Sequence, residues 1–127
     1  MANAKIKGIT IEFNGYSTKL GQALKSVEGE SQKANSSLRE INNSLKFNPG
    51  NAELISQQQR KLSEAISNTK DKLKVLIEAD KQAKEQLANG QIGQEQYDAP
   101  QREIIKTENQ LGNYGNQLKK SKEEQKN

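Results

Sequence analysis

The chain has 127 residues and a hydrophobic fraction of 31%, below the roughly 45–50% of ordinary globular domains, so it can bury a narrow apolar stripe but no thick core. It contains no Cys and no His, which excludes disulfides, a Cys or His nucleophile and the usual zinc sites. Its net charge of +4 is spread along the chain with acidic residues among the basic ones, unlike the one-sided basic stripe of a nucleic-acid-binding surface.

The first predicted element is a short β-strand over about residues 9–13. Ile9, Ile11 and Phe13 alternate with polar residues, and the turn pair Asn14-Gly15 follows. A single strand leaves backbone donors and acceptors unpaired along both edges. The rest of the sequence predicts no partner strand, so we expect these three residues to pair with another chain. The alternative is that they pack against a helix or remain disordered.

A long helix is predicted next, over about residues 17–47, from apolar residues spaced alternately four and three positions apart. This spacing places one stripe along a slightly supercoiled helix, where it must be buried against another helix. The members of this heptad seam are Leu20, Leu24, Val27, Ser31, Ala34, Leu38, Ile41 and Leu45. The helix should end before Pro49, because a proline disfavours helical geometry at the preceding residue.

The four residues Asn48, Pro49, Gly50 and Asn51 predict a tight turn between helices. Pro49 fixes its own φ, Gly50 is permissive, and Asn51 can cap the next helix. The sequence therefore predicts an αα-hairpin. A ligand-binding loop is the less favoured interpretation, since turn chemistry alone accounts for every residue.

The second predicted helix runs over about residues 52–88 and ends at Asn89-Gly90, a usual C-terminal pair. Its heptad seam consists of Ile55, Gln59, Leu62, Ile66, Thr69, Leu73, Leu76, Asp80, Ala83 and Leu87. Polar seam residues can fix helix register, or they can mark places where helices splay and water enters. For Asp80, and for Glu108 in the third segment, we expect splaying, because an unpaired buried carboxylate is costly.

A weaker third helix is predicted over about residues 98–112 or beyond. Pro100 would interrupt a helix that begins at Gly93, so we place the start of the main helix at Asp98, with Gln101 in the reciprocal capping-box position. A short turn of helix from Gln94 to Tyr97 before it remains an alternative. The seam contacts of the main helix are Ile104 and Leu111. Gly112 and Gly115 weaken the seam, and we expect order to fade after about residue 112.

The sequence as a whole predicts a mainly α fold of long, coiled-coil-like helices. We divide it into a strand segment (1–15), a helical hairpin (16–89) and a third helical segment with a polar tail (90–127). Paired carboxylates, phosphate-binding loops and nucleophile motifs do not stand out, and Gly90-Gln91-Ile92-Gly93 lacks the ending of a P-loop. We therefore predict neither an enzyme nor a cofactor or metal site.

The order of these motifs resembles the N-terminal region of bacteriophage tail tape measure proteins, also called phage minor tail proteins, of siphophages and prophages. The match covers nearly the whole chain to Leu111. The residues that carry it are Ile6 to Glu12, Thr18, Leu20, Ala23, Leu24, Leu45, Asn48 to Asn51, Glu53, Leu54, Gln59, Leu62, Ala65, Ile66, Thr69, Lys70, Lys72, Leu73, Gly90, Ile92, Tyr97, Arg102 to Ile104, Thr107, Glu108 and Leu111.

The resemblance implies a virion structural protein that acts in tail-length determination and tail assembly. It further implies a homo-oligomer that contacts phage tail or tail-assembly proteins, present in the host bacterial cytoplasm during assembly and then in the virion tail. Neither a specific nucleic-acid partner nor membrane binding is expected. A free-standing coiled-coil scaffold or assembly chaperone, or a basic nucleic-acid-binding helical module, remains an alternative. A single helix of this length would span only about 190 Å, so we interpret the chain as a fragment or terminal module of a longer ruler.

Overall fold

The computed structural model describes residues 11–12, 15–16 and 18–126. Within them, a hairpin of β1 (Ile11–Glu12) and β2 (Gly15–Tyr16) precedes the helices α1 (Thr18–Phe47), α2 (Ala52–Ala88) and α3 (Gln94–Lys126). The prediction of a mainly α fold is confirmed, and the predicted bounds of the helical hairpin agree with α1 and α2 to within one residue at its start.

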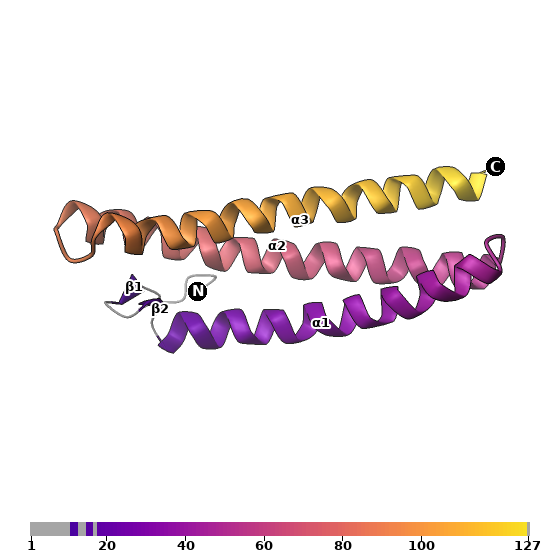
Figure 1. The fold of residues 1–127 in the computed structure, drawn as a ribbon, viewed down its shortest axis with the longest axis horizontal. Coiled ribbons are helices and arrows are strands. Elements are labelled where there is room, and N and C mark those ends of the chain that lie inside the picture. Colours follow the sequence, from indigo (N-terminus) through magenta and orange to yellow (C-terminus); the bar gives the residue numbers. More distant parts are fainter. Residues whose placement is uncertain (1–10, 13–14, 17, 127) are drawn as a thin grey trace, which may run out of the picture.

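The helices lie side by side and alternate in direction, so that α1 and α3 run parallel to each other and antiparallel to α2 (Figure 1). With 37 residues, α2 spans about 55 Å at ~1.5 Å per residue. Both α1 and α3 pack along α2, but they approach each other far less closely than either approaches α2. The central helix α2 therefore has to present apolar residues to a neighbour on each side.

The turn between α1 and α2 forms as the sequence predicts. The Asn51 side-chain oxygen accepts a hydrogen bond of 2.9 Å from the backbone N–H of Leu54, which caps α2. The Asn51 backbone N–H in turn donates to the carbonyl of Asn48 at 3.2 Å. Capping and turn closure thus use the same asparagine.

The C-terminal end of α2 also follows the prediction, because Gly90 has a φ of +74°. In this left-handed conformation the backbone turns out of the helix, and the N–H of Gln91 donates to the carbonyl of Gln86 at 2.8 Å. A glycine is favoured here because it has no Cβ.

The third helix differs from the prediction at both ends. It begins at Gln94 instead of Asp98 and continues to Lys126 instead of fading after residue 112. The earlier start has a local cause, since the Gln96 side chain accepts from the Gly93 N–H at 2.9 Å, in the reciprocal capping-box position. Pro100 therefore lies inside the helix, and its side chain is fully buried.

The strand prediction is correct in part. Ile11 and Glu12 pair antiparallel with Tyr16 and Gly15 of the same chain, so the partner for these two residues is intramolecular. The sequence pattern of β2 is too short to predict a strand, which is why the sequence indicates only a partner from another chain. Ile9 and Phe13 lie outside the described residues.

Candidate functional site

Buried apolar side chains form one cluster towards each end of the helical rod. The first contains Leu20, Leu24, Leu76, Ala79, Ala83 and Ile92. The second contains Ala34, Leu38, Leu62, Ala65 and Tyr114. The first cluster joins α1 to α2, and Tyr97 and Ile104 of α3 pack against it. The second joins all three helices, so a narrow apolar stripe and not a thick core holds the fold together.

The structure places the predicted seam of α1 against α2. Leu20, Leu24, Leu38 and Ile41 are buried, as is Ala34, whereas Val27 and Leu45 are half-buried. Because α1 packs closely against α2 alone, the predicted heptad seam accounts for its buried side chains.

The predicted seam of α2 is correct at one of its two heptad positions, but it omits a third heptad position that is also buried. Leu62, Thr69, Leu76 and Ala83 are buried, but so are Ala65 and Ala79, which the sequence analysis missed. The remaining predicted contacts are half-buried: Ile55, Ile66, Leu73 and Leu87 of α2, and Ile104 and Leu111 of α3. Because α2 packs against both α1 and α3, its buried apolar stripe is wider than that of α1. The small side chains of Ala65 and Ala79 allow a neighbouring helix to approach α2 closely.

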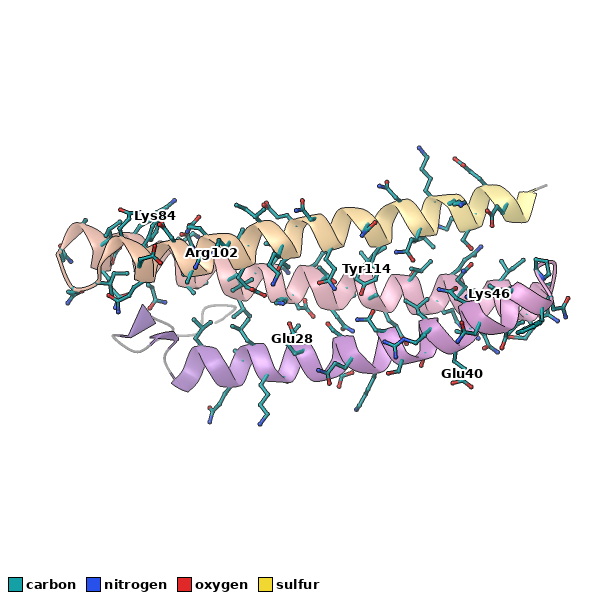
Figure 2. The ribbon with its side chains drawn as sticks, in the orientation of Figure 1. Glu28, Glu40, Lys46, Lys84, Arg102 and Tyr114 are labelled. Atoms are coloured by element: carbon teal, nitrogen blue, oxygen red, sulfur yellow. The ribbon has the colours of Figure 1, made fainter. Side chains whose placement is uncertain are left out.

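Between α1 and α3 lies a groove whose floor is α2, and this groove is the candidate functional site. One hollow of about 710 Å³ is lined by charged and amide side chains that include Glu28, Asn35, Lys72 and Glu103. Another, of about 750 Å³, lies beside the turn between α1 and α2. In Figure 2, Glu28 and Tyr114 lie between α1 and α3, whereas Glu40 points away from α1 on the far side.

Lys72 of α2 connects both walls of this groove. Its ammonium lies 2.5 Å from Glu28 Oε1 of α1 and 3.0 Å from Glu103 Oε1 of α3, and its side chain is only 12% exposed. Burial alone would lower the pKa of Lys72, but hydrogen bonds and attraction from the two carboxylates outweigh it, so its pKa lies above the ordinary 10.5. A charged lysine therefore ties α1, α2 and α3 together.

Tyr114 of α3 forms a second polar connection, and this one reaches α1 directly. Its hydroxyl donates to Asn35 Oδ1 at 2.5 Å and lies 3.4 Å from the amide nitrogen of Gln110. The ring of Tyr114 packs in the second apolar cluster. One residue thus contributes to the core with its ring and to the groove with its hydroxyl.

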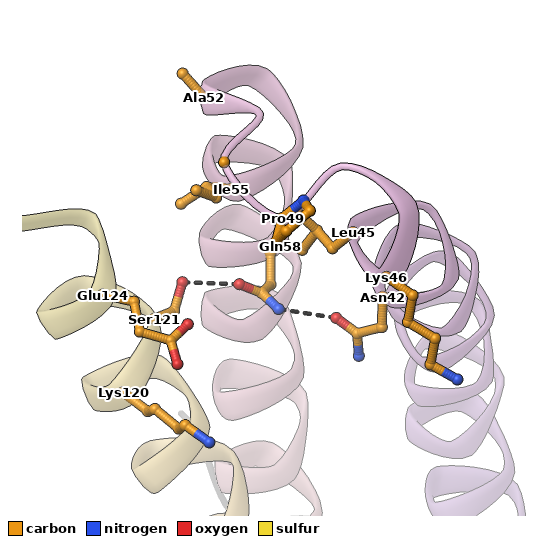
Figure 3. Close-up of a pocket in the computed structure, with 11 residues that line it drawn as sticks. Asn42, Leu45, Lys46, Pro49, Ala52, Ile55, Gln58, Lys120, Ser121 and Glu124 are labelled. Carbon is orange, nitrogen blue, oxygen red and sulfur yellow. Dashed lines mark hydrogen bonds between the residues drawn. The ribbon is translucent and has the colours of Figure 1, made fainter. Parts of the chain in front are cut away.

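A third connection lies near the turn between α1 and α2 (Figure 3). Gln58 of α2 donates to Asn42 Oδ1 of α1 at 2.8 Å and accepts from the hydroxyl of Ser121 of α3 at 2.8 Å. Ser121 is buried, and it also accepts from Gln59 at 3.4 Å. We call these three connections the polar rungs.

On α1 the rung residues Glu28, Asn35 and Asn42 follow the heptad period, each seven residues apart. On α2, Gln58 and Lys72 are two heptads apart. On α3, Tyr114 and Ser121 are one heptad apart, whereas Glu103 lies outside this period. The period could have been read from the sequence, but the pairing could not, because it depends on the register of one helix against another.

The polar seam residues differ in burial and in hydrogen bonding. Asp80 does not splay into solvent: its side chain is 15% exposed, accepts from the Gln101 amide and pairs with Lys84 at 3.4 Å. The expectation for Asp80 is therefore wrong, because partners on α2 and α3 compensate its burial. Glu108 is exposed, as expected. Thr69 donates to the carbonyl of Ala65 at 2.7 Å and is thus satisfied within its own helix.

The groove residues hold helices together by hydrogen bonds and ion pairs. Across the described ranges, no cluster of three or more Asp or Glu side chains is arranged to hold a metal ion. Within the same ranges, no helix has the length and apolarity that a membrane span requires. No protein-family model, curated protein or solved structure matches this chain.

Proposed function

We propose that this chain is a structural module of a bacteriophage tail tape measure protein, which contributes to tail assembly and tail-length determination through helix–helix contacts. The observation that carries this proposal is the antiparallel packing of helices of 30, 37 and 33 residues along heptad seams. Such helices have a length set by residue number, at ~1.5 Å per residue, which is the physical basis of a molecular ruler.

Association with further copies or with tail-assembly proteins belongs to the same proposal. Phe47, Ile77 and Ile105 are large apolar residues exposed by 91%, 42% and 56% respectively. Burying such side chains against another helix is favourable, at about 25 cal/mol per Å² of apolar surface. These residues therefore offer contacts for an oligomer or a tail protein, in the host cytoplasm during assembly and afterwards in the tail.

Tail length in a phage that carries this gene tests the proposal. We expect in-frame deletion of residues 18–126 to shorten the tail by about 160 Å if the segment is extended as one helix, or by about 55 Å if it remains folded on itself. Replacing the same residues with an unrelated heptad sequence of equal length is the matched control and should restore the tail length. Electron microscopy of purified tails gives the measurement.

Mass spectrometry of the same purified tails separates a tape measure from an assembly chaperone. A tape measure segment should be present in finished tails. A chaperone should be present in assembly intermediates and absent from finished tails. Unchanged tail length after the deletion, together with absence of the chain from tails, would contradict the proposal.

A further inference from the structure

The composition of α3 changes at Tyr114. Upstream of it, α3 buries Pro100 and Thr107, and Ile104 and Tyr97 pack against the first apolar cluster. Downstream, Leu118 is the one apolar side chain between residues 115 and 124. We call residues 115–126 the α3 arm.

Within the arm, the side chains of Leu118 and Ser121 contact the rest of the molecule. Leu118 is half-buried and packs against the second apolar cluster. Ser121 is held by Gln58 and Gln59 of α2. A helical segment attached through one aliphatic side chain and a small set of hydrogen bonds is bound less strongly than the upstream part of α3.

A hollow of about 750 Å³ separates the arm from the turn between α1 and α2, and Leu45 and Ile55 contribute to its lining (Figure 3). Ile55 occupies a seam position of α2, yet the residues of the arm that line the same hollow, Lys120, Ser121 and Glu124, are all polar. The apolar contact that would fix the end of α3 to α2 is therefore missing.

Two glycines flank the last buried aromatic residue, Tyr114. Gly112 and Gly115 are exposed, and a Cβ added at either position would meet no atom within 4 Å. Neither glycine is thus required by packing, and each weakens the helix relative to alanine. They place a flexible point of the backbone at the start of the arm.

We infer that the α3 arm detaches and unwinds as one unit from Gly115 onward, while the α1–α2 hairpin and residues 94–114 stay folded. Most helical stability in proteins comes from tertiary packing, so an arm detached from α2 loses the support of its helical hydrogen bonds. Detachment uncovers the edge of α2 around Gln58 and Leu62 without unfolding the protein. The arm is a removable cover on one end of the groove, and this inference does not depend on the proposed function.

Amide hydrogen exchange of the full chain, followed by NMR, tests the inference. We expect protection factors for residues 116–122 at least about 100-fold lower than those for residues 98–110 and for residues 55–66 of α2. They should be similar to one another across the arm, because one opening exposes all of these amides. A steady gradient towards the C-terminus would indicate simple fraying and overturn the inference, as would equal protection throughout α3.

Two variants with opposite effects make the test sharper. Gly115→Ala should raise arm protection about fourfold, because it favours the helix that opening destroys. Leu118→Ala should lower arm protection at least about tenfold and leave residues 98–110 unchanged. Gly29→Ala is the matched control, since Gly29 is also exposed with open space around it, but in α1. Equal effects of Gly29→Ala and Gly115→Ala on the arm would mean that it opens only by global unfolding, and would overturn the inference.

Discussion

The hydroxyl of Tyr114 donates a hydrogen bond to the side chain of Asn35, which lies 79 positions earlier in the chain. This contact joins α1 to α3 across the groove, where the two backbones are farther from each other than either is from α2. The tyrosine ring meanwhile packs against α2 residues of the second apolar cluster. A single side chain thus couples the packing of α3 on α2 to the position of α1.

Replacing Tyr114 with Phe should lower the free energy of unfolding by about 1 kcal/mol. The substitution keeps the ring in the core and removes the hydrogen bond to Asn35, which is itself only half-buried and can bind water instead. Urea denaturation followed by circular dichroism measures the change. A loss above about 3 kcal/mol would show that the ring, and not the hydroxyl, had been disturbed.

Replacing Lys72 with Met should cost about 1–3 kcal/mol of stability. Methionine retains the aliphatic stem but leaves Glu28 and Glu103 without their shared cation, and their side chains are 44% and 29% exposed. Lys70→Met is the matched control on an exposed position of the same helix and should change stability by less than about 0.5 kcal/mol. Comparable losses in the two variants would argue against the Lys72 rung.

The contribution of Lys72 should also depend on pH. Because its pKa is raised above 10.5 in the folded state, its stabilising effect is complete below 10.5 and is lost as the pH rises through the folded-state pKa. The difference in unfolding free energy between the natural chain and Lys72→Met should therefore shrink at pH values above 10.5. A difference that stays constant there would contradict a charged bridge.

The buried residues of a helix are easier to predict from the sequence when the helix packs against one neighbour than when it packs against two. The seam of α1 was predictable, because a helix with one close neighbour buries one narrow stripe. For α2, the same reasoning missed Ala65 and Ala79, because a second neighbour extends the buried surface to a further heptad position. Alanine at these positions is consistent with either burial or exposure until the neighbouring helix is known.

Two sequence features near the start of α3 predict different first residues for this helix. Pro100 favoured a late start, but Gln96 caps Gly93 and the helix begins before the proline. The polar rungs were not predictable at all as pairs. Lys72 and Glu103 are 31 positions apart, and their contact exists only once the register of α2 against α3 is fixed.

Neighbouring positions on α2 offer a direct test of which face is buried. Leu76 is fully buried, whereas Ile77 is 42% exposed. Leu76→Ala should therefore destabilise the protein by about 3–5 kcal/mol, through lost burial and the cavity left behind. Ile77→Ala, the matched control, should cost less than about 1 kcal/mol. Equal losses in thermal or urea unfolding would mean that α2 presents a different face to its neighbours.

Two glycines with equal space around them should respond in opposite ways to alanine. A Cβ added at Gly29 or at Gly90 would meet no atom within 4 Å, so steric clash decides neither case. Gly29 lies inside α1, and Gly29→Ala should raise the free energy of unfolding by about 0.5–1 kcal/mol, because alanine loses less backbone entropy on folding.

Gly90 has a φ of +74°, so Gly90→Ala should instead lower the free energy of unfolding by about 1–2 kcal/mol, the strain of a Cβ in the left-handed region. Urea denaturation of the two single variants gives both values under identical conditions. A change of the same sign in both would contradict the left-handed end of α2, because helix propensity alone would then account for the two effects.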